Sequence, residues 1–268
     1  MLEDKEFWKR MTVHTDLSEL VPYAVGHPSL IKIQENIWVI KNFVTPEVNK
    51  IFTDYAESTN EEDWWKKNRN WWVGKYLFID EDSSIKKDAD ELMGKINELV
   101  SKDIITGGIG SIHRLTPGQE MFIHTDNPTE SRFLKDDDGK VVGSTEGHNN
   151  YCILAMVLYH SDFKGGNLFF PNLGIEYHGE RGDLVIFPGT GVLYDHGVRK
   201  TDLDSPNRYI STAFGYDKRG EEIKKSGYVF EDPITGAKVD PEPATIEQDP
   251  FTVVNNTDGS KFIKNTNA

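Results

Sequence analysis

The chain has 268 residues, enough for one large domain or one domain with extensions, and a chain of this length needs no disulfide or structural metal to fold. Its formal net charge of −14 argues against a general nucleic-acid-binding surface, which requires clustered Lys and Arg. The single cysteine, Cys152, excludes an intramolecular disulfide, and there is neither an apolar run of membrane-spanning length nor a signal-peptide pattern. We therefore expect a soluble, cytoplasmic protein with neither a nucleic-acid nor a membrane partner; the sequence carries no signal for oligomeric state.

The first third of the chain predicts an N-terminal arm, one strand and two helices. Residues 1–35 have a mixed composition and are interpreted as the arm, and ENIWVIKNF (35–43) predicts a strand rich in Ile, Val and Trp. The first helix is expected to follow, with Thr45 as N-cap and Pro46 at its first position. Its apolar residues at helical spacing are Val48, Ile51, Phe52 and Tyr55. A second helix is predicted over 83–103, with Ile85, Ala89, Leu92, Ile96 and Leu99 on one face.

From about residue 104 the sequence changes to short β-rich segments separated by Gly, Pro, Asn and Asp. The segments are GSIHRL, EMFIHTD, YCILAMVLYH, GNLFFP, IEYHGE, DLVIFPG, VLYDHGV and RYISTAFGY. Many short strands at regular spacing indicate a sandwich or barrel, with the preceding helices packed outside one sheet. After Gly220 the chain becomes polar and Pro-rich, and residues 217–268 are interpreted as a C-terminal extension.

One polar pair stands out within the stretch MFIHTDNPTE (121–130). His124 and Asp126 are two residues apart, so on a strand both side chains would point to the same face. Imidazole and carboxylate are both metal ligands, and a second histidine from another strand would complete a two-His-one-carboxylate set. His196, in VLYDHGVRK, is the candidate. Arg208 follows at the start of an apolar strand, where a guanidinium suits a bound carboxylate.

Each of these residues alone has a plainer interpretation. A lone strand histidine is more often structural, and Arg208 alone would more often form a surface salt bridge. It is the order of His-x-Asp, several strands, His and then Arg that makes the set specific. The remaining histidines His113, His148, His160 and His178 show no such pattern and are interpreted as structural or solvent-facing, and Cys152 as inert core.

In these motifs the sequence resembles the Fe(II)- and 2-oxoglutarate-dependent dioxygenases, in particular the prolyl 4-hydroxylase-like branch. The resemblance spans residues 36–216 and rests on TPGQEMFIHTDNP, LYHSDFKGGNLFFP, GDLVIFPG, DHGV and RYISTAFGYD, together with the N-terminal strand and helix. It implies a double-stranded β-helix, or jelly-roll, core with the N-terminal helices outside. It also implies Fe(II) bound by His124, Asp126 and His196, and 2-oxoglutarate bound by Arg208 and Tyr159.

The family reaction hydroxylates an unactivated C–H with O2 as a further cosubstrate, ascorbate as a candidate reductant, and release of succinate and CO2. The resemblance implies a prolyl or other amino-acid side chain in a peptide or protein as substrate. The sequence departs from the family where Leu115 and Met121 stand at positions that often carry a tyrosine, and the loop TDLDSP before Arg208 is long. Phe214 stands where nucleobase demethylases of this superfamily usually have a second arginine, which disfavours a nucleic-acid substrate.

Two other functions remain open at this stage. A phytanoyl-type hydroxylase would share the metal ligands and act on a small molecule. A cupin-like binding module would keep the barrel without oxygen chemistry. The Trp-rich segment DWWKKNRNWW (63–72) is interpreted as packing on the sheet and helices, with a substrate-binding lid as the alternative.

Overall fold

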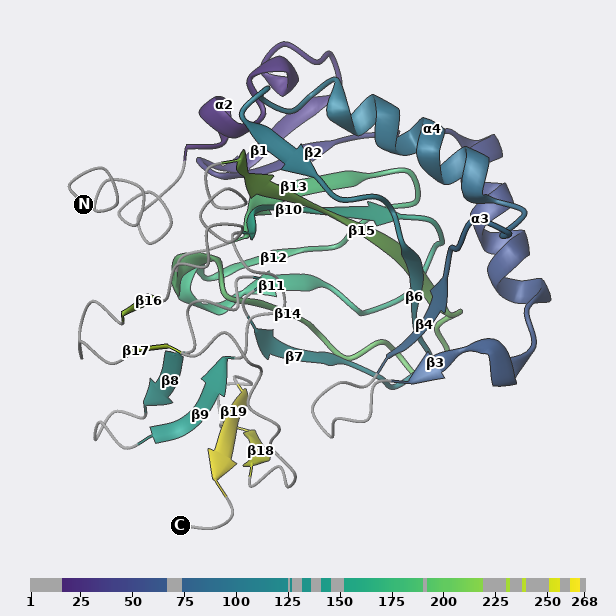
Figure 1. The fold of residues 1–268 in the computed structure, drawn as a ribbon. Helices are drawn as coiled ribbons and strands as arrows, with labels where there is room; N and C mark the ends of the chain where they lie inside the picture. Colours follow the sequence, from purple (N-terminus) through teal and green to yellow (C-terminus); the bar gives the residue numbers. More distant parts are fainter. Residues whose placement is uncertain are drawn as a thin grey trace.

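The computed structural model describes residues 16–66, 74–124, 126, 132–135, 141–145, 152–189 and 192–218, and four short strands further along the chain. Its architecture is mainly β, with two main antiparallel sheets and helices on the outside (Figure 1). The larger sheet has nine strands in the order β1-β2-β13-β10-β15-β6-β4-β3, with β5 paired to β15. The smaller has the order β12-β11-β14-β7. The bounds in the larger sheet are β1 (Leu30–Gln34), β2 (Ile37–Ile40), β3 (Trp65–Lys66), β4 (Lys75–Phe78), β5 (Ile104–Thr106), β6 (Ser111–Leu115), β10 (Cys152–Tyr159), β13 (Leu184–Pro188) and β15 (Arg208–Asp217). Those in the smaller are β7 (Met121–His124), β11 (Leu168–Phe170), β12 (Ile175–Tyr177) and β14 (His196–Val198).

The path of the chain between the two sheets identifies the fold. From β6 onward it alternates between larger and smaller sheet through β7, β10 and β11, turns within the smaller sheet to β12, and alternates again through β13, β14 and β15. This winding is the double-stranded β-helix, or jelly roll. The eight strands that build it are the eight predicted from the β-rich segments, so the predicted fold class is confirmed.

Two helices cover the outer face of the larger sheet (Figure 1). Helix α3 (Pro46–Ser58) begins after Thr45, whose side chain accepts a hydrogen bond from the backbone N–H of Val48, as predicted. Helix α4 (Lys86–Asn97) lies within the range expected for the second helix, and the five apolar residues predicted for its buried face are all buried, although Ile85 and Leu99 lie just outside the helix. In α3 the prediction is wrong at Ile51, which is exposed, because the buried face follows Asn49, Phe52 and Ala56 instead.

Alternation along the strands divides the core in two. Side chains on the outer face of the larger sheet pack against the helices, and include Trp38, Leu154, Met156, Leu158 and Tyr209. Those on the inner face pack between the sheets, and include Val39, Val157, Tyr159, Val185, Phe187 and Ile210, with Phe170 from the smaller sheet. The inner space is therefore largely apolar, which gives the few polar groups within it particular weight.

Part of the expected N-terminal arm belongs to the sheet. Strand β1 pairs with β2, and the short helix α2 (Leu17–Leu20) buries Leu17 and Leu20 in the outer core. In the expected C-terminal extension, β16 (Phe230–Glu231) pairs with β17 (Lys238–Val239), and β18 (Phe251–Asn255) with β19 (Lys261–Asn265). A further hairpin joins β8 (Arg132–Lys135) to β9 (Val141–Thr145). The predicted domain boundaries otherwise stay predictions. No helix in the described residues is long and apolar enough to cross a membrane.

Candidate metal centre

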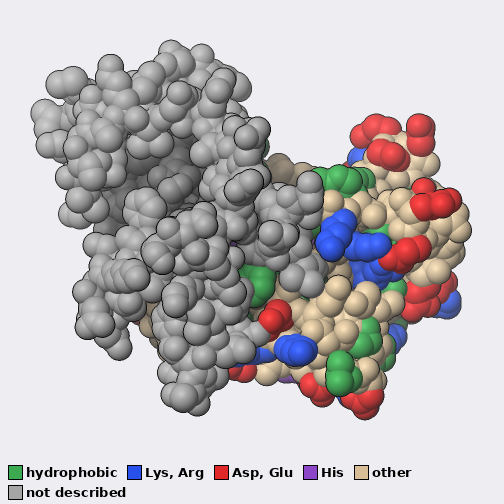
Figure 2. Space-filling model, turned by 90° about the horizontal axis from the view of Figure 1, so that it is seen from below, with side chains coloured by type: hydrophobic (Ala, Val, Ile, Leu, Met, Phe, Trp, Pro, Cys, Tyr) green, Lys and Arg blue, Asp and Glu red, His purple; other side chains and the backbone are tan. Residues whose placement is uncertain are grey.

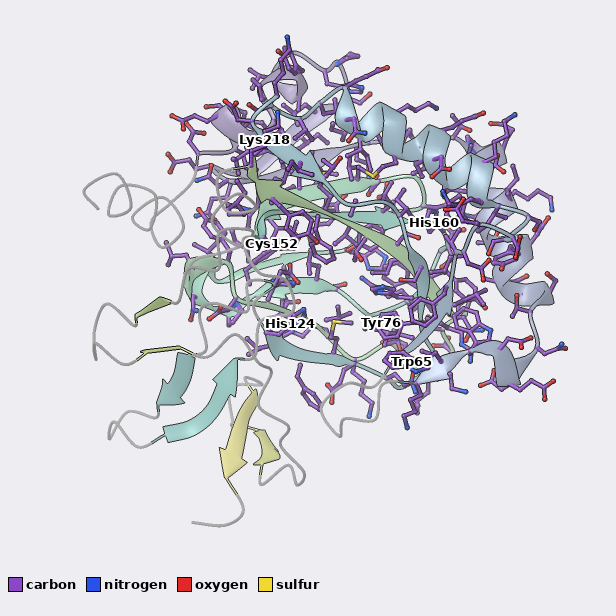
Figure 3. The ribbon with its side chains drawn as sticks, in the orientation of Figure 1. Trp65, Tyr76, His124, Cys152, His160 and Lys218 are labelled. Carbon is purple, nitrogen blue, oxygen red and sulfur yellow. The ribbon has the colours of Figure 1, made fainter. Side chains whose placement is uncertain are left out.

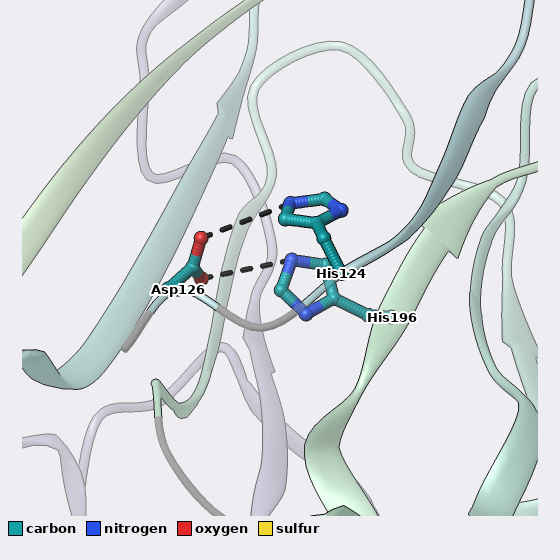
Figure 4. Close-up of side chains that lie close together, drawn as sticks. All are labelled: His124, Asp126 and His196. Atoms are coloured by element: carbon teal, nitrogen blue, oxygen red, sulfur yellow. Dashed lines mark ion pairs between the residues drawn. The ribbon is translucent and has the colours of Figure 1, made fainter. Parts of the chain in front are cut away.

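Three buried side chains converge at the smaller sheet (Figure 4). His124 ends β7 and His196 begins the neighbouring strand β14, and the two are directly paired in the sheet register. Asp126 lies just beyond His124. One ligand atom from each residue can be chosen so that all three lie within 4.8 Å of one another. The two histidines and the aspartate singled out in the sequence are thus brought together.

Asp126 reaches the cluster in a different way from the one that the sequence predicts. The sequence predicted one strand carrying both His124 and Asp126, but β7 ends at His124 and Asp126 lies in a bend. Strand alternation therefore orients the histidine only. Pro128 follows shortly in the sequence, and proline cannot donate to a sheet ladder, which disfavours a longer strand here.

The histidine rings are oriented in the same way and leave the same nitrogen available. In His124, Nδ1 lies 2.9 Å from the backbone carbonyl oxygen of Phe122, and in His196, Nδ1 lies 3.0 Å from that of Tyr194. A carbonyl oxygen can only accept, so Nδ1 carries the proton in both rings. In the neutral rings the lone pair is then on Nε2, and a backbone carbonyl on the other nitrogen is typical of metal-binding histidines.

Distances among the ligand atoms fit one shared ion. Nε2 of His124 lies 3.8 Å from Oδ1 of Asp126, and Nε2 of His196 lies 3.6 Å from Oδ2. Both distances are too long for hydrogen bonds. Ligand atoms bound to one first-row ion at about 2.1 Å lie about 3–3.5 Å apart, so only a small contraction is needed. The two imidazoles and the carboxylate thus face one another at a spacing that suits a shared metal ion.

Burial sets the protonation of the site. It raises the pKa of Asp126 to about 6, an effect that His124 opposes. It lowers the pKa of His196 to about 4, opposed by the hydrogen bond to the Tyr194 carbonyl. At neutral pH the site therefore presents an ionised carboxylate and a neutral imidazole, the forms in which these groups bind metals. Phe187 packs edge-on against the ring of His196, with ring centroids 4.7 Å apart, and so restricts its orientation.

A buried cation lies on the facing sheet. Arg208, the first residue of β15, is 1% exposed, and its Nη2 donates to the Tyr159 hydroxyl at 3.4 Å. The rings of Tyr159 and Phe163 each lie 5.1 Å from the centre of the guanidinium. Among the described residues, Arg208 Nε has no hydrogen-bond partner, and none of the described ion pairs involves this side chain. Arg208 and Tyr159, singled out together in the sequence, thus lie together around an incompletely satisfied charge.

Two further polar side chains reach the space between the sheets and were not predicted. Tyr76 in β4 and His113 in β6 are directly paired, and their rings meet edge-on with centroids 4.2 Å apart. Figure 3 shows Tyr76 and His124 extending toward the same inner space from different sheets. In GSIHRL, alternation places His113 on the same face as Leu115, and this was the available signal for His113.

The expectation of a structural role is confirmed for His160. Its two ring nitrogens lie 3.2 Å from Asn49 Oδ1 and 3.0 Å from Ser211 Oγ, and its ring stacks on Phe52. Burial lowers its pKa to about 3, so it stays neutral. Cys152 is free and buried, as expected.

The first two tryptophans of the Trp-rich segment differ in burial. Trp64 is buried in the outer core and packs against Tyr209 and Arg114. Trp65 is 46% exposed and lies beside Tyr76 and Phe78. Trp71 and Trp72 lie outside the described residues. The packing role is therefore confirmed for Trp64, while Trp65 packs against the sheet with one part of its side chain and exposes the rest.

Surface charge is uneven despite the acidic composition. In the described part of the face shown in Figure 2, Lys and Arg side chains gather near the centre, and acidic side chains lie mostly toward the outer margin. The net charge of −14 is thus compatible with local approach of an anion.

No protein-family model and no curated protein matches the sequence. Among solved structures, the chain is similar to a prolyl hydroxylase from Trichoplax adhaerens in complex with a hypoxia inducible factor oxygen degradation domain peptide fragment. The identity is 14% and the TM-score 0.49, with 83% of this chain and 94% of that chain covered. It is also similar to a Pseudomonas putida prolyl-4-hydroxylase, with 18% identity, a TM-score of 0.48 and coverage of 75% and 99%. A third is HygX from Streptomyces hygroscopicus with nickel and 2-oxoglutarate bound, with 15% identity, a TM-score of 0.44 and coverage of 73% and 86%.

Proposed function

We propose that this chain is an Fe(II)- and 2-oxoglutarate-dependent oxygenase that hydroxylates an unactivated C–H and releases succinate and CO2. The observation that carries the proposal is the pairing of two sites inside one jelly roll. A two-His-one-carboxylate set lies on the smaller sheet, and a buried, incompletely satisfied arginine lies on the larger. The first suits a metal ion and the second suits an organic anion.

His124, Asp126 and His196 would hold the metal. Two imidazoles and one carboxylate are the ligand set of non-haem Fe(II) oxygenases, and they leave positions open for a cosubstrate and O2. When bound, the iron supplies the oxygen activation that these side chains cannot perform. The backbone carbonyls of Phe122 and Tyr194 keep each Nε2 aimed at the ion, and the apolar inner face limits the access of water.

Arg208 would hold the far carboxylate of 2-oxoglutarate. A buried guanidinium without an anionic partner is unfavourable, because its lost hydration is not replaced. A carboxylate would supply the missing charge and match the planar fork of the guanidinium. Arg208 already donates a hydrogen bond to the hydroxyl of Tyr159, which would orient the guanidinium. Because Arg208 and the metal ligands lie on facing sheets, 2-oxoglutarate would lie between them.

A peptide or protein side chain is the substrate class that we propose. Trp65 packs against both Tyr76 and Phe78 at the edge of the larger sheet, and Phe78 is 53% exposed. Exposed aromatic rings of this kind bind extended, proline-containing segments through apolar contact. The aromatic row leads from solvent toward His113 and the metal ligands, so it would form one wall of the substrate entrance.

The test begins with the metal and cosubstrate. Anaerobic titration of the protein with Fe(II) and then 2-oxoglutarate should give a visible charge-transfer band, absent in His124→Ala. With O2, a peptide library should yield succinate and a product heavier by one oxygen atom, detected by mass spectrometry. A wild-type protein that binds neither Fe(II) nor 2-oxoglutarate would refute the proposal. Turnover of small molecules without turnover of any peptide would refute the substrate class only.

Gly179 offers a separate test of the Tyr159–Arg208 pair. A Cβ added at Gly179 would lie 2.2 Å from the Tyr159 ring, which is fully buried and cannot move outward freely. We expect Gly179→Ala to displace Tyr159 and to destabilise the fold by about 1–3 kcal/mol through overpacking. The affinity for 2-oxoglutarate should fall while Mn(II) affinity is kept. Calorimetric titration and thermal unfolding measure the two effects.

Gly94→Ala is the matched control. A Cβ at this position of α4 meets nothing within 4 Å, so the substitution should stabilise the helix by about 0.5–1 kcal/mol without changing 2-oxoglutarate affinity. Equal affinity in Gly179→Ala and wild type would show that the position of the Tyr159 ring is unimportant for the anion.

A further inference from the structure

One ring nitrogen of His113 is buried without a hydrogen-bond partner among the described residues. This atom is Nδ1, while Nε2 lies 3.1 Å from Ser111 Oγ. A buried polar atom without a partner is unfavourable, and such atoms are few in native proteins. His160 shows the contrast, because both of its nitrogens are paired. A purely structural role would account for one side of the His113 ring and leave the other unexplained.

The sheet register places His113 beside Arg208, the anion-binding half of the proposed site. His113 is directly opposite Ile210 on β15, and Arg208 lies two residues before Ile210, so His113 and Arg208 are diagonal neighbours on the inner face. Burial is the main cause that lowers the pKa of His113 to about 3, with smaller contributions from Arg208 and His124. The ring therefore lies within electrostatic reach of both the buried guanidinium and a metal ligand, and it is neutral.

The neighbouring side chains hold the His113 ring in place but leave its Nδ1 edge without a partner among the described residues. Ser111 holds Nε2, and Tyr76 packs edge-on against the ring. If the Ser111 hydroxyl donates to Nε2, Nδ1 carries the proton and becomes a neutral donor. A neutral donor can bind an anion without adding a further positive charge beside Arg208 and the metal.

We infer that His113 binds the keto-acid end of 2-oxoglutarate through Nδ1–H, between Arg208 and the metal ligands. This rests on the proposed function, in which Arg208 holds the opposite carboxylate. His113 would thus be a binding residue of the same cosubstrate, contributed by a strand that provides none of the other ligands. A hydrogen bond to a charged acceptor is worth about 1.5–3 kcal/mol, which corresponds to a loss of about 10- to 100-fold in affinity on its removal.

The experiment measures binding to the full-length, Mn(II)-loaded protein without O2, by calorimetry. The probes are 2-oxoglutarate and pyruvate, which has the keto-acid end but lacks the far carboxylate. His113→Ala should weaken both ligands about 10- to 100-fold. Arg208→Gln should weaken 2-oxoglutarate only. Manganese affinity should stay unchanged in both variants.

Two conservative variants separate binding from a structural role. An Asn amide can take the place of Nδ1, whereas a Gln amide reaches the place of Nε2 and its bond to Ser111. We expect His113→Asn to keep 2-oxoglutarate binding within about threefold of wild type and His113→Gln to resemble His113→Ala. The reverse order, or wild-type affinity in His113→Ala, overturns the inference. If the wild-type protein itself binds no 2-oxoglutarate, the proposed function fails instead, so the two failures are distinguishable.

Discussion

Replacing Asp126 with Ala should abolish metal binding and 2-oxoglutarate turnover while leaving the fold intact. Asp126 is the one anionic member of the three-residue cluster, and it faces Nε2 of both His124 and His196. Loss of a residue that merely supports a ligand typically costs about 10- to 100-fold in metal affinity or activity. Loss of the carboxylate itself should therefore cost more than about 100-fold.

The fold should tolerate this change because the carboxylate is buried at a cost. Burial raises its pKa to about 6, which means that the ionised form is less favourable in the folded protein than in the unfolded chain. Removing a charge that burial makes unfavourable should release this cost in the metal-free protein. Asp126→Ala should thus unfold at a temperature equal to or above that of the metal-free wild type. Metal should raise the unfolding temperature of the wild type alone.

Calorimetric titration with Mn(II) or Fe(II), combined with thermal unfolding with and without metal, measures both effects. Asp162→Ala is the control, because Asp162 is a surface residue whose ion pair with Arg181 is exposed. It should match the wild type in metal binding. Retained metal affinity in Asp126→Ala would exclude this cluster as the iron site.

The strands of the barrel could be predicted because each is short, apolar and bounded by turn residues. β10 and β13 are buried along their whole length, and their sequences CILAMVLY and LVIFP are continuous apolar runs. The winding of the chain between two sheets does not follow from any single segment. The family resemblance implied this winding, and the strand order shows it.

What the sequence did not predict lies mostly at the edges. Strands β3 and β4 extend the larger sheet beyond β6, but at two and four residues they are too short to give a clear alternation. Strand β1 lies in the range predicted as an arm from its mixed composition, and it exposes most of its residues, as an edge strand can. Such strands are fixed by pairing with distant segments rather than by their own composition.

The sequence singled out the residues of the candidate site that the structure brings together, except for Tyr76 and His113. The pairing of His124 with His196 depends on the register between β7 and β14, which the order of motifs indicated only indirectly. Recognising His113 required the knowledge that β6 lies beside β15, because only that neighbourhood brings it near Arg208. Sequence alternation could place it on a face, but not beside a particular partner.

Replacing Arg208 with Gln should abolish 2-oxoglutarate binding at ordinary concentrations while leaving the metal ligands unaffected. Truncating one partner of a buried, hydrogen-bonded charge pair costs about 2–5 kcal/mol, which is a loss in affinity of about 30-fold or more. The apparent Km for 2-oxoglutarate should rise by a similar factor. Arg208→Lys should restore affinity only in part, because an ammonium keeps the charge but loses the planar fork.

The metal-free and ligand-free protein should not suffer from this substitution. Arg208 is buried without an anionic partner among the described residues, and burial lowers its pKa, so the charge is unfavourable in the empty fold. Gln has no charge to desolvate, and Arg208→Gln should unfold at a temperature close to or above that of the wild type. The stability gained on adding 2-oxoglutarate should disappear, since a ligand stabilises only the protein that binds it.

Arg181→Gln is the matched control, since Arg181 is half exposed and its ion pair with Asp162 lies at the surface. It should leave both 2-oxoglutarate affinity and Mn(II) affinity unchanged. If Arg208→Gln instead destabilised the ligand-free fold strongly and left 2-oxoglutarate affinity unchanged, the buried guanidinium would be a structural element. The cosubstrate would then have to bind elsewhere between the two sheets. Loss of affinity with an unaltered fold would tie the charge of Arg208 to the ligand, because no other measured property would have changed.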